Sequence, residues 1–151
     1  MPKMKHFIQW LVIFSLIILG LFVMTYSGIM ARINEADFTK ISFVIIALFL
    51  LQSFRIGIDL FRGGIIEEKL INSAYFFAES FTKLGFIGTI AGFIYALYHT
   101  FTGINIADMA STQTALIAMA TGIGTALYTT ITGLVCSLLI RIQLYNYEKD
   151  R

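Results

Sequence analysis

The chain has 151 residues, of which 58% are hydrophobic and 13% are charged, with a formal net charge of +2. Soluble domains carry about 25% charged residues, so this composition excludes an ordinary soluble globular protein. The small net charge, with no cluster of Lys and Arg, argues against a nucleic-acid partner. Cys136 is the single cysteine, which excludes an intrachain disulfide and a cysteine metal cage.

Four apolar stretches predict an all-α integral membrane protein, since a helix needs about 20 mostly apolar residues to cross a bilayer. The second stretch reaches this length if Lys40 and Arg55 extend to opposite interfaces. The fourth uncharged run would be about 48 Å long as one helix, so we expect it to tilt, to project beyond the hydrocarbon, or to start with a turn at residues 108–111. The expected spans, in a single domain over residues 1–151, are residues 7–30, 38–58, 84–103 and 112–140.

The first stretch also has features of a secretory signal peptide, because Lys3 and Lys5 precede an apolar run. That run is longer than the apolar core of an ordinary signal peptide, and no clear small-x-small cleavage site follows it. We therefore expect a retained helix.

The distribution of Lys and Arg predicts the orientation, since cytoplasmic loops are enriched in both. Four spans place both termini on one side. Arg32 and Lys40 fall on the opposite side, and every other Lys and Arg falls on the side of the termini. Both termini are therefore expected in the cytoplasm, with outer loops at residues 27–40 and 102–111. On the cytoplasmic side, residues 63–83 are expected to form an amphipathic helical connector after a glycine hinge.

Small residues recur along the last two spans at helical spacing. In the third span they form one face, at Gly85, Gly88, Gly92 and Ala96. The fourth span carries a similar set, at Gly122, Ala126 and Gly133. Faces of small residues let two helix backbones approach closely, so these positions predict helix packing.

Threonines are the other unusual feature of these spans. Thr89 lies beside the small face of the third span. The fourth span presents one face of Thr121, Thr125, Thr129 and Thr132, with Thr130 on the neighbouring face. Two interpretations stay open. The hydroxyls can form interhelical hydrogen bonds, or they can line a pore in which they replace part of an ion's hydration shell.

The interiors of the four spans carry no Asp, Glu, Lys or Arg. Machines driven by protons or sodium ions normally need a membrane carboxylate. If the threonine face conducts ions, another polypeptide must supply that acid. The spans also lack the paired Ser/His, paired Asp or metal-ligand arrangements of intramembrane enzymes, so we expect no catalytic residue, no metal and no cofactor.

Two segments resemble the MotA/TolQ/ExbB family of ion-channel motor subunits. They are residues 84–92, with the sequence LGFIGTIAG, and residues 126–134, with the sequence ALYTTITGL. Family members carry LG-x-x-GT-x-x-G at the start of one helix and AL-x-x-T-x-x-GL in the next, across a short outer loop. Each motif alone is weakly specific, and the two together in this order are fairly specific. The detailed resemblance covers about residues 80–145.

The resemblance implies a homopentamer around a dimer of single-span partner helices of the MotB/ExbD/TolR kind, in a bacterial cytoplasmic (inner) membrane. Each partner helix would carry one Asp, H+ or Na+ would cross at the interface, and charging of the Asp would drive rotation. Thr89 and Thr130 correspond to the family's pore-facing hydroxyls, and Thr129 to the first member of a Thr-Thr pair. The positions at which the inner helices of the family approach one another correspond to Gly85, Gly88, Gly92 and Gly133.

One departure from the family narrows the expectation. Flagellar stators have a large cytoplasmic loop between their second and third spans, whereas the connection here has about 20 residues. A small, non-flagellar member is therefore expected. Two alternatives are a non-conducting structural protein, whose threonines only pack helices, and a stand-alone transporter, which should contain the membrane carboxylate that this chain lacks.

Overall fold

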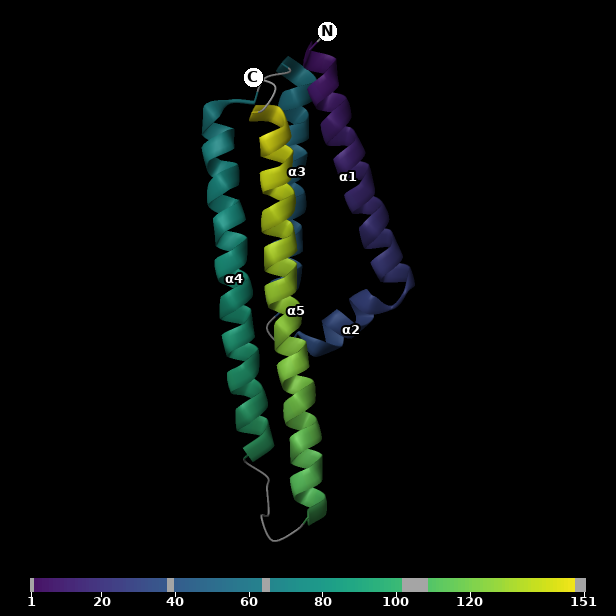
Figure 1. Ribbon diagram of the computed structural model, residues 1–151, viewed down its shortest axis with the longest axis vertical. Helices are drawn as coiled ribbons and strands as arrows, with labels where there is room; N and C mark the ends of the chain where they lie inside the picture. Colours follow the sequence, from purple (N-terminus) through teal and green to yellow (C-terminus); the bar gives the residue numbers. More distant parts are fainter. Residues whose placement is uncertain (1, 38–39, 64–65, 102–108, 149–151) are drawn as a thin grey trace.

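The computed structural model describes residues 2–37, 40–63, 66–101 and 109–148, and over these ranges the chain is α-helical without strands. The long helices lie side by side in a bundle, and a short helix lies across it (Figure 1). The elements are α1 (Pro2–Tyr26), α2 (Ile29–Ala36), α3 (Ile41–Gly63), α4 (Glu68–Phe101) and α5 (Met109–Glu148).

The four long helices are each long and apolar enough to cross a membrane. This confirms the prediction of four candidate spans. The start of α1 and the end of α5 lie at the same end of the bundle (Figure 1). Which side of the membrane holds that end stays a prediction from the distribution of Lys and Arg.

The segment expected as an outer loop at residues 27–40 contains a helix instead. Gly28, with a φ of 74°, adopts the left-handed conformation that glycine tolerates, and it turns the chain from α1 into α2. Asp37 then holds the start of α3, because its Oδ2 accepts a hydrogen bond from the Ser42 N–H at 2.8 Å. This aspartate is only 3% exposed.

Two helices are longer than the predicted spans. Helix α4 runs without a break from Glu68 through the expected connector into the third span, since no Gly or Pro interrupts residues 68–84. Helix α5 begins at Met109, so the turn expected at residues 108–111 is helical from that residue; Asp108 lies outside the described residues. It also continues past residue 140 to Glu148.

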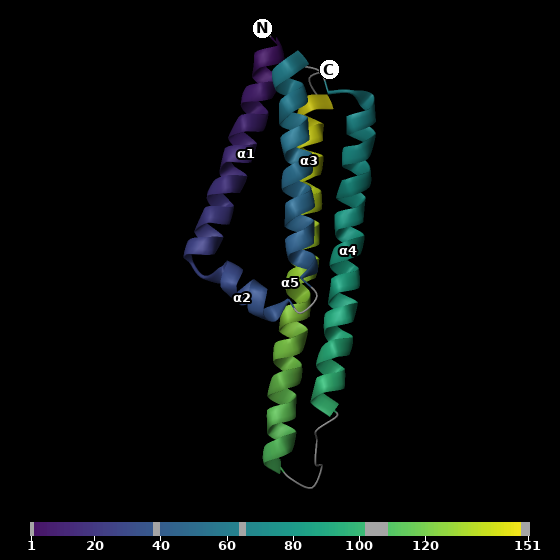
Figure 2. The same cartoon turned by 180° about the vertical axis from the view of Figure 1, so that it is seen from behind.

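Helices α4 and α5 form an antiparallel hairpin that reaches well beyond α2 (Figures 1 and 2). With 34 and 40 residues, they are about 51 and 60 Å long, whereas α3 with 23 residues is about 35 Å long. Projection of the fourth span beyond the hydrocarbon, or its tilt in the bilayer, stays a prediction.

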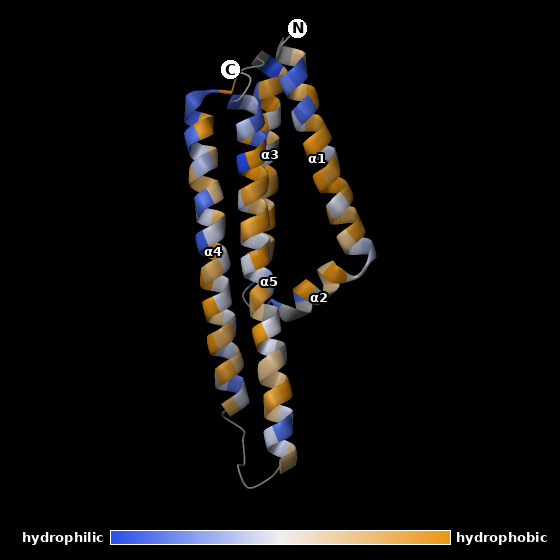
Figure 3. Cartoon of the chain, in the orientation of Figure 1, coloured by the Kyte–Doolittle hydropathy of each residue, from blue (hydrophilic) through white to orange (hydrophobic). Residues whose placement is uncertain are grey.

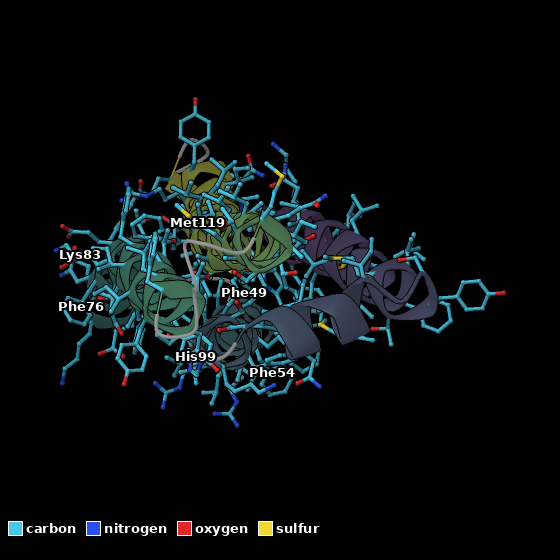
Figure 4. The ribbon with its side chains drawn as sticks, turned by 90° about the horizontal axis from the view of Figure 1, so that it is seen from below. Phe49, Phe54, Phe76, Lys83, His99 and Met119 are labelled. Carbon is cyan, nitrogen blue, oxygen red and sulfur yellow. The ribbon has the colours of Figure 1, made fainter. Side chains whose placement is uncertain are left out.

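The most deeply buried side chains come from α3, α4 and α5. Ile56, Phe81 and Ile140 have no exposed surface. Viewed along the bundle, Phe49 points between the helices while Phe76 points away from them (Figure 4). Helix α1 is different, since none of its described side chains is fully buried. Its residues are nevertheless largely apolar along its length (Figure 3), as expected for a helix in contact with lipid.

Polar contacts tie the helices together at the end where the chain starts and finishes. The Tyr147 hydroxyl accepts a hydrogen bond from the Ile66 N–H at 3.0 Å, just before α4 begins. The Tyr75 hydroxyl donates to Glu148 Oε2 at 2.9 Å. These bonds hold the first turns of α4 against the last turns of α5, and they set the register of the hairpin.

Candidate functional site: a threonine cluster between α4 and α5

The small residues of α4 lie directly against α5. A Cβ atom added at Gly85 would come within 3.0 Å of the Thr129 carbonyl oxygen and 3.2 Å of the Thr130 Cα. One added at Gly88 would lie 2.9 Å from the Thr129 side chain. Backbone atoms cannot move aside as a flexible side chain can, so glycine at position 85 allows the two helices to approach this closely.

The contact continues along both helices. A Cβ at Gly92 would lie 2.9 Å from the Ala126 Cβ, one at Gly122 would overlap the Ala96 Cβ, and one at Gly133 would overlap the Phe81 carbonyl oxygen. The structure therefore places every residue of the two predicted small faces at the α4–α5 interface.

Three threonines meet at this interface, and we call Thr89, Thr129 and Thr130 the threonine cluster. The Thr89 hydroxyl contacts the Thr130 hydroxyl and lies 3.4 Å from the Thr129 hydroxyl. Two backbone carbonyl oxygens also lie within hydrogen-bonding distance of the Thr89 hydroxyl. Thr89 Oγ1 lies 3.0 Å from the Gly85 oxygen and 3.1 Å from the Ala126 oxygen.

The other two hydroxyls use the same carbonyls. Thr129 Oγ1 donates to the Ala126 oxygen at 2.8 Å, and Thr130 Oγ1 donates to the Gly85 oxygen at 3.3 Å. Each hydroxyl has one proton and two lone pairs. The three hydroxyl protons therefore have more acceptor oxygens within reach than they can use at once. Each hydroxyl can change the oxygen to which it donates without leaving a proton unpaired.

The members of the cluster differ in exposure. Thr129 is 2% exposed, whereas Thr89 and Thr130 are only partly buried. Thr129 therefore packs within the hairpin, whereas Thr89 and Thr130 keep part of their surface exposed.

Thr132 lies elsewhere. Its hydroxyl donates to the Tyr128 oxygen at 2.8 Å, within its own helix, and its side chain lines a groove between α5 and α1. The structure does not bring Thr132 into the threonine cluster, because its side chain borders the groove on the side of α1. The side chains of Thr121 and Thr125 fall outside the described ones.

The structure also contains a polar pair that the sequence analysis did not single out. Ser53 on α3 and Gln143 on α5 are both buried. The Gln143 Nε2 donates to Ser53 Oγ at 2.9 Å, and Ser53 Oγ lies 3.1 Å from Gln143 Oε1. No rule of residue spacing connects positions 90 residues apart, so the sequence does not indicate that these two side chains form a pair.

In the part of the chain that the structure describes, His, Cys and acidic side chains do not gather into a group of three that could hold a metal ion. The α4 and α5 segments around the cluster, residues 84–101 and 109–140, also contain no Asp, Glu, Lys or Arg. The cluster can donate and accept hydrogen bonds, but it has no group that changes charge near neutral pH.

The model of one protein family, the MotA/TolQ/ExbB proton channel family, matches residues 68–151. The match covers the whole of α4 and α5, and therefore the whole threonine cluster. No curated protein and no solved structure shows significant similarity to the chain.

Proposed function

Because the chain belongs to the MotA/TolQ/ExbB proton channel family, we propose that it is the ion-conducting subunit of a small membrane motor. The observation that supports this proposal is the threonine cluster, in which two partly exposed hydroxyls, Thr89 and Thr130, lie together on the helices that carry the family match. In this proposal several copies, a pentamer by resemblance, surround single-span partner helices in a bacterial inner membrane.

The partner supplies the acid. Since residues 84–101 and 109–140 contain no carboxylate, the titrating group for H+, or the anionic ligand for Na+, must come from a membrane Asp on the partner helix. Thr89 and Thr130 then face this Asp. When it is charged, they donate hydrogen bonds to it; when it is neutral, their protons return to the Gly85 and Ala126 carbonyls.

Because of this exchange, the charged Asp is bound more strongly than the neutral Asp when it lies beside Thr89 and Thr130. A hydrogen bond to a charged group is worth about 1.5–3 kcal/mol, and one to a neutral group about 0.5–1.5 kcal/mol. An Asp beside Thr89 and Thr130 is held while charged and is released more readily once protonated. Repeated around a ring of copies, this difference converts ion entry into stepwise movement of the partner relative to the ring.

The test is proton flux through the complex purified with its native partner and reconstituted in vesicles that contain a pH-sensitive dye. Thr130→Val preserves the shape of the side chain and removes the hydroxyl, and we expect a loss of about tenfold or more in flux, the equivalent of about 1.4 kcal/mol in the barrier. A parallel series with a sodium gradient distinguishes the two ions.

Thr132→Val is the matched control, because it removes a threonine hydroxyl from the same helix on the side away from the cluster. Flux that falls equally in both variants, or in neither, contradicts the assignment of Thr130 to the ion pathway.

A second candidate function, a non-conducting structural protein, is favoured by one observation. Each hydroxyl of the threonine cluster already has a carbonyl acceptor within the hairpin, so packing alone satisfies all three. This alternative predicts that Thr130→Val changes stability slightly and leaves flux, if the vesicles show any, unaltered.

A further inference from the structure

A large apolar groove lies on the side of α5 away from the threonine cluster. It has a volume of about 440 Å³ and is walled by α1, α2, α3 and α5. Helix α4 takes no part in it, and Figures 1 and 2 show α1 and α4 on opposite sides of the bundle. Apart from α5, the helices that wall the groove lie outside the family match, and the groove opens on the side of α5 away from the threonine cluster.

The lining of the groove is hydrocarbon almost throughout. Among its described lining residues, only Thr132 and Cys136 carry a hydroxyl or thiol, and the Thr132 hydroxyl already donates to the Tyr128 oxygen. A water molecule needs two to four polar partners, which this lining does not offer. An engineered cavity of about 150 Å³ with a similar lining stays dry and takes up benzene. The groove suits an apolar occupant of larger size.

The gap between α1 and its neighbours is narrow near the start of α1 and wide near its end (Figure 1). Near the start of α1, Trp10 packs into the space left by Gly57, and its Nε1 donates to the Ser53 oxygen at 3.2 Å. Near its end, α2 separates α1 from α3 by the length of an 8-residue helix, about 12 Å. Figure 1 shows the resulting wedge, which narrows toward the start of α1.

The length of the groove matches one leaflet of a bilayer. On α1 it extends from Ile13 to Met24, which is about 17 Å along a helix axis, and half of a hydrocarbon core of about 30 Å is about 15 Å. Trp10, which stacks on Phe14 with ring centroids 4.9 Å apart, precedes the first groove residue of α1, Ile13.

A basic side chain lies near the other end of the groove, where α2 meets α3. Lys40 is exposed at the start of α3, and its ammonium group contacts Asn34 Oδ1 on α2 at 2.7 Å. A basic side chain at the level of a lipid head group attracts its phosphate.

From this combination of volume, lining, length and charge, we propose that the groove binds one acyl chain of a phospholipid from the leaflet that contains α2. The chain fills the wedge between α1 and α5, and the phosphate lies beside the α2–α3 corner. Since helices in a membrane associate through packing rather than through the hydrophobic effect, the lipid acts as the packing partner that α1 otherwise lacks.

The experiment uses the full chain in vesicles of phosphatidylethanolamine and phosphatidylglycerol, with a fraction of the phosphatidylglycerol carrying a photoreactive diazirine on an acyl chain. Irradiation followed by peptide mapping shows where the lipid chain lies. We expect labelling of Cys136, which lines the groove and is only 6% exposed. Its neighbours Leu134 and Leu138 are 47% and 58% exposed and do not line the groove, so label on them reports the surrounding lipid.

Gly20 provides the decisive variant, because it lines the groove and a Cβ added there meets no atom within 4 Å. Because the Cβ enters open space, Gly20→Leu places a large apolar side chain in the groove, and we expect the labelling of Cys136 to be lost. Gly124→Leu is the matched control, since a Cβ at Gly124 also meets nothing within 4 Å and this residue does not line the groove. The smaller Gly20→Ala should keep most of the label.

Equal labelling of Cys136 in the wild type and in Gly20→Leu overturns the proposal, as does the absence of label on Cys136 in the wild type. Cross-links from the groove to a second copy of the chain also overturn it, because they make a neighbouring subunit the occupant. Loss of label in Gly20→Leu with retention in Gly124→Leu supports it.

Discussion

The hydroxyls of Thr89 and Thr130 contact each other across the α4–α5 interface although 41 positions separate them in the chain. They meet because Gly85, one turn before Thr89, lets the backbone of α5 approach to van der Waals contact. The glycines and the threonines therefore form one arrangement, in which the small residues set the distance that brings the hydroxyls together.

The pairing of these hydroxyls should be measurable as a coupling energy. We expect Thr89→Val and Thr130→Val to destabilise the protein together by less than the sum of their separate effects. The difference should be about 0.6 kcal/mol, the average for interhelical hydrogen bonds in membranes. A double-mutant cycle on unfolding in mixed detergent micelles measures it. Strictly additive effects would show that the two hydroxyls do not interact.

The glycines of the interface should tolerate alanine to different degrees. Gly85→Ala places a Cβ within 3.0 Å of a backbone oxygen, so we expect a loss of about 1–3 kcal/mol in the free energy of unfolding, typical of an overpacked core. Gly124→Ala is the control, since its Cβ would meet no neighbouring atom. Equal stability of the two variants would contradict the close approach at Gly85.

The docking of α1 can be followed through Trp10, which is the single tryptophan of the chain. A Cβ at Gly57 would overlap its indole ring, so we expect Gly57→Ala to displace the ring and to break the hydrogen bond from its Nε1 to the Ser53 oxygen. The emission maximum of the tryptophan should then shift. Gly20→Ala, on α1 itself, should leave it unchanged, and an unaltered spectrum for Gly57→Ala would place Trp10 elsewhere.

The buried pair of Ser53 and Gln143 should show the cost of an unsatisfied polar group. Ser53→Ala leaves the Gln143 side-chain amide without its partner, so we expect a loss of about 1–3 kcal/mol in the free energy of unfolding. The double variant Ser53→Ala with Gln143→Leu removes both polar groups and should recover part of that loss. A double variant less stable than Ser53→Ala alone would show that Gln143 is stabilised by other contacts.

Much of the architecture was predictable from local composition. A run of about 20 apolar residues implies a helix across the bilayer because no other single segment satisfies its own backbone there, and the four candidate spans follow from this rule. The length of α4 was harder to predict. Residues 63–83 are too polar to count as a span, yet they have no helix breaker after Glu68, so the helix simply continues.

The short helix α2 shows where such reasoning fails. Its eight residues are too few to be stable as a helix in isolation. It forms because the left-handed Gly28 starts it, while Asp37 beyond its end caps the next helix. Both are effects of single residues, which a search for apolar periodicity does not detect.

Within the site, residue spacing placed Thr89 beside the small face of its helix and gathered the threonines of the fourth span on one broad side. Spacing defines an angle around one helix and says nothing about which neighbour lies at that angle. The packing of the helices decided the rest: Thr129 and Thr130 face α4, whereas Thr132 faces the groove beside α1. The Ser53–Gln143 pair and the groove itself likewise exist only once α1, α3 and α5 are assembled, because each requires side chains or surfaces from helices far apart in the chain.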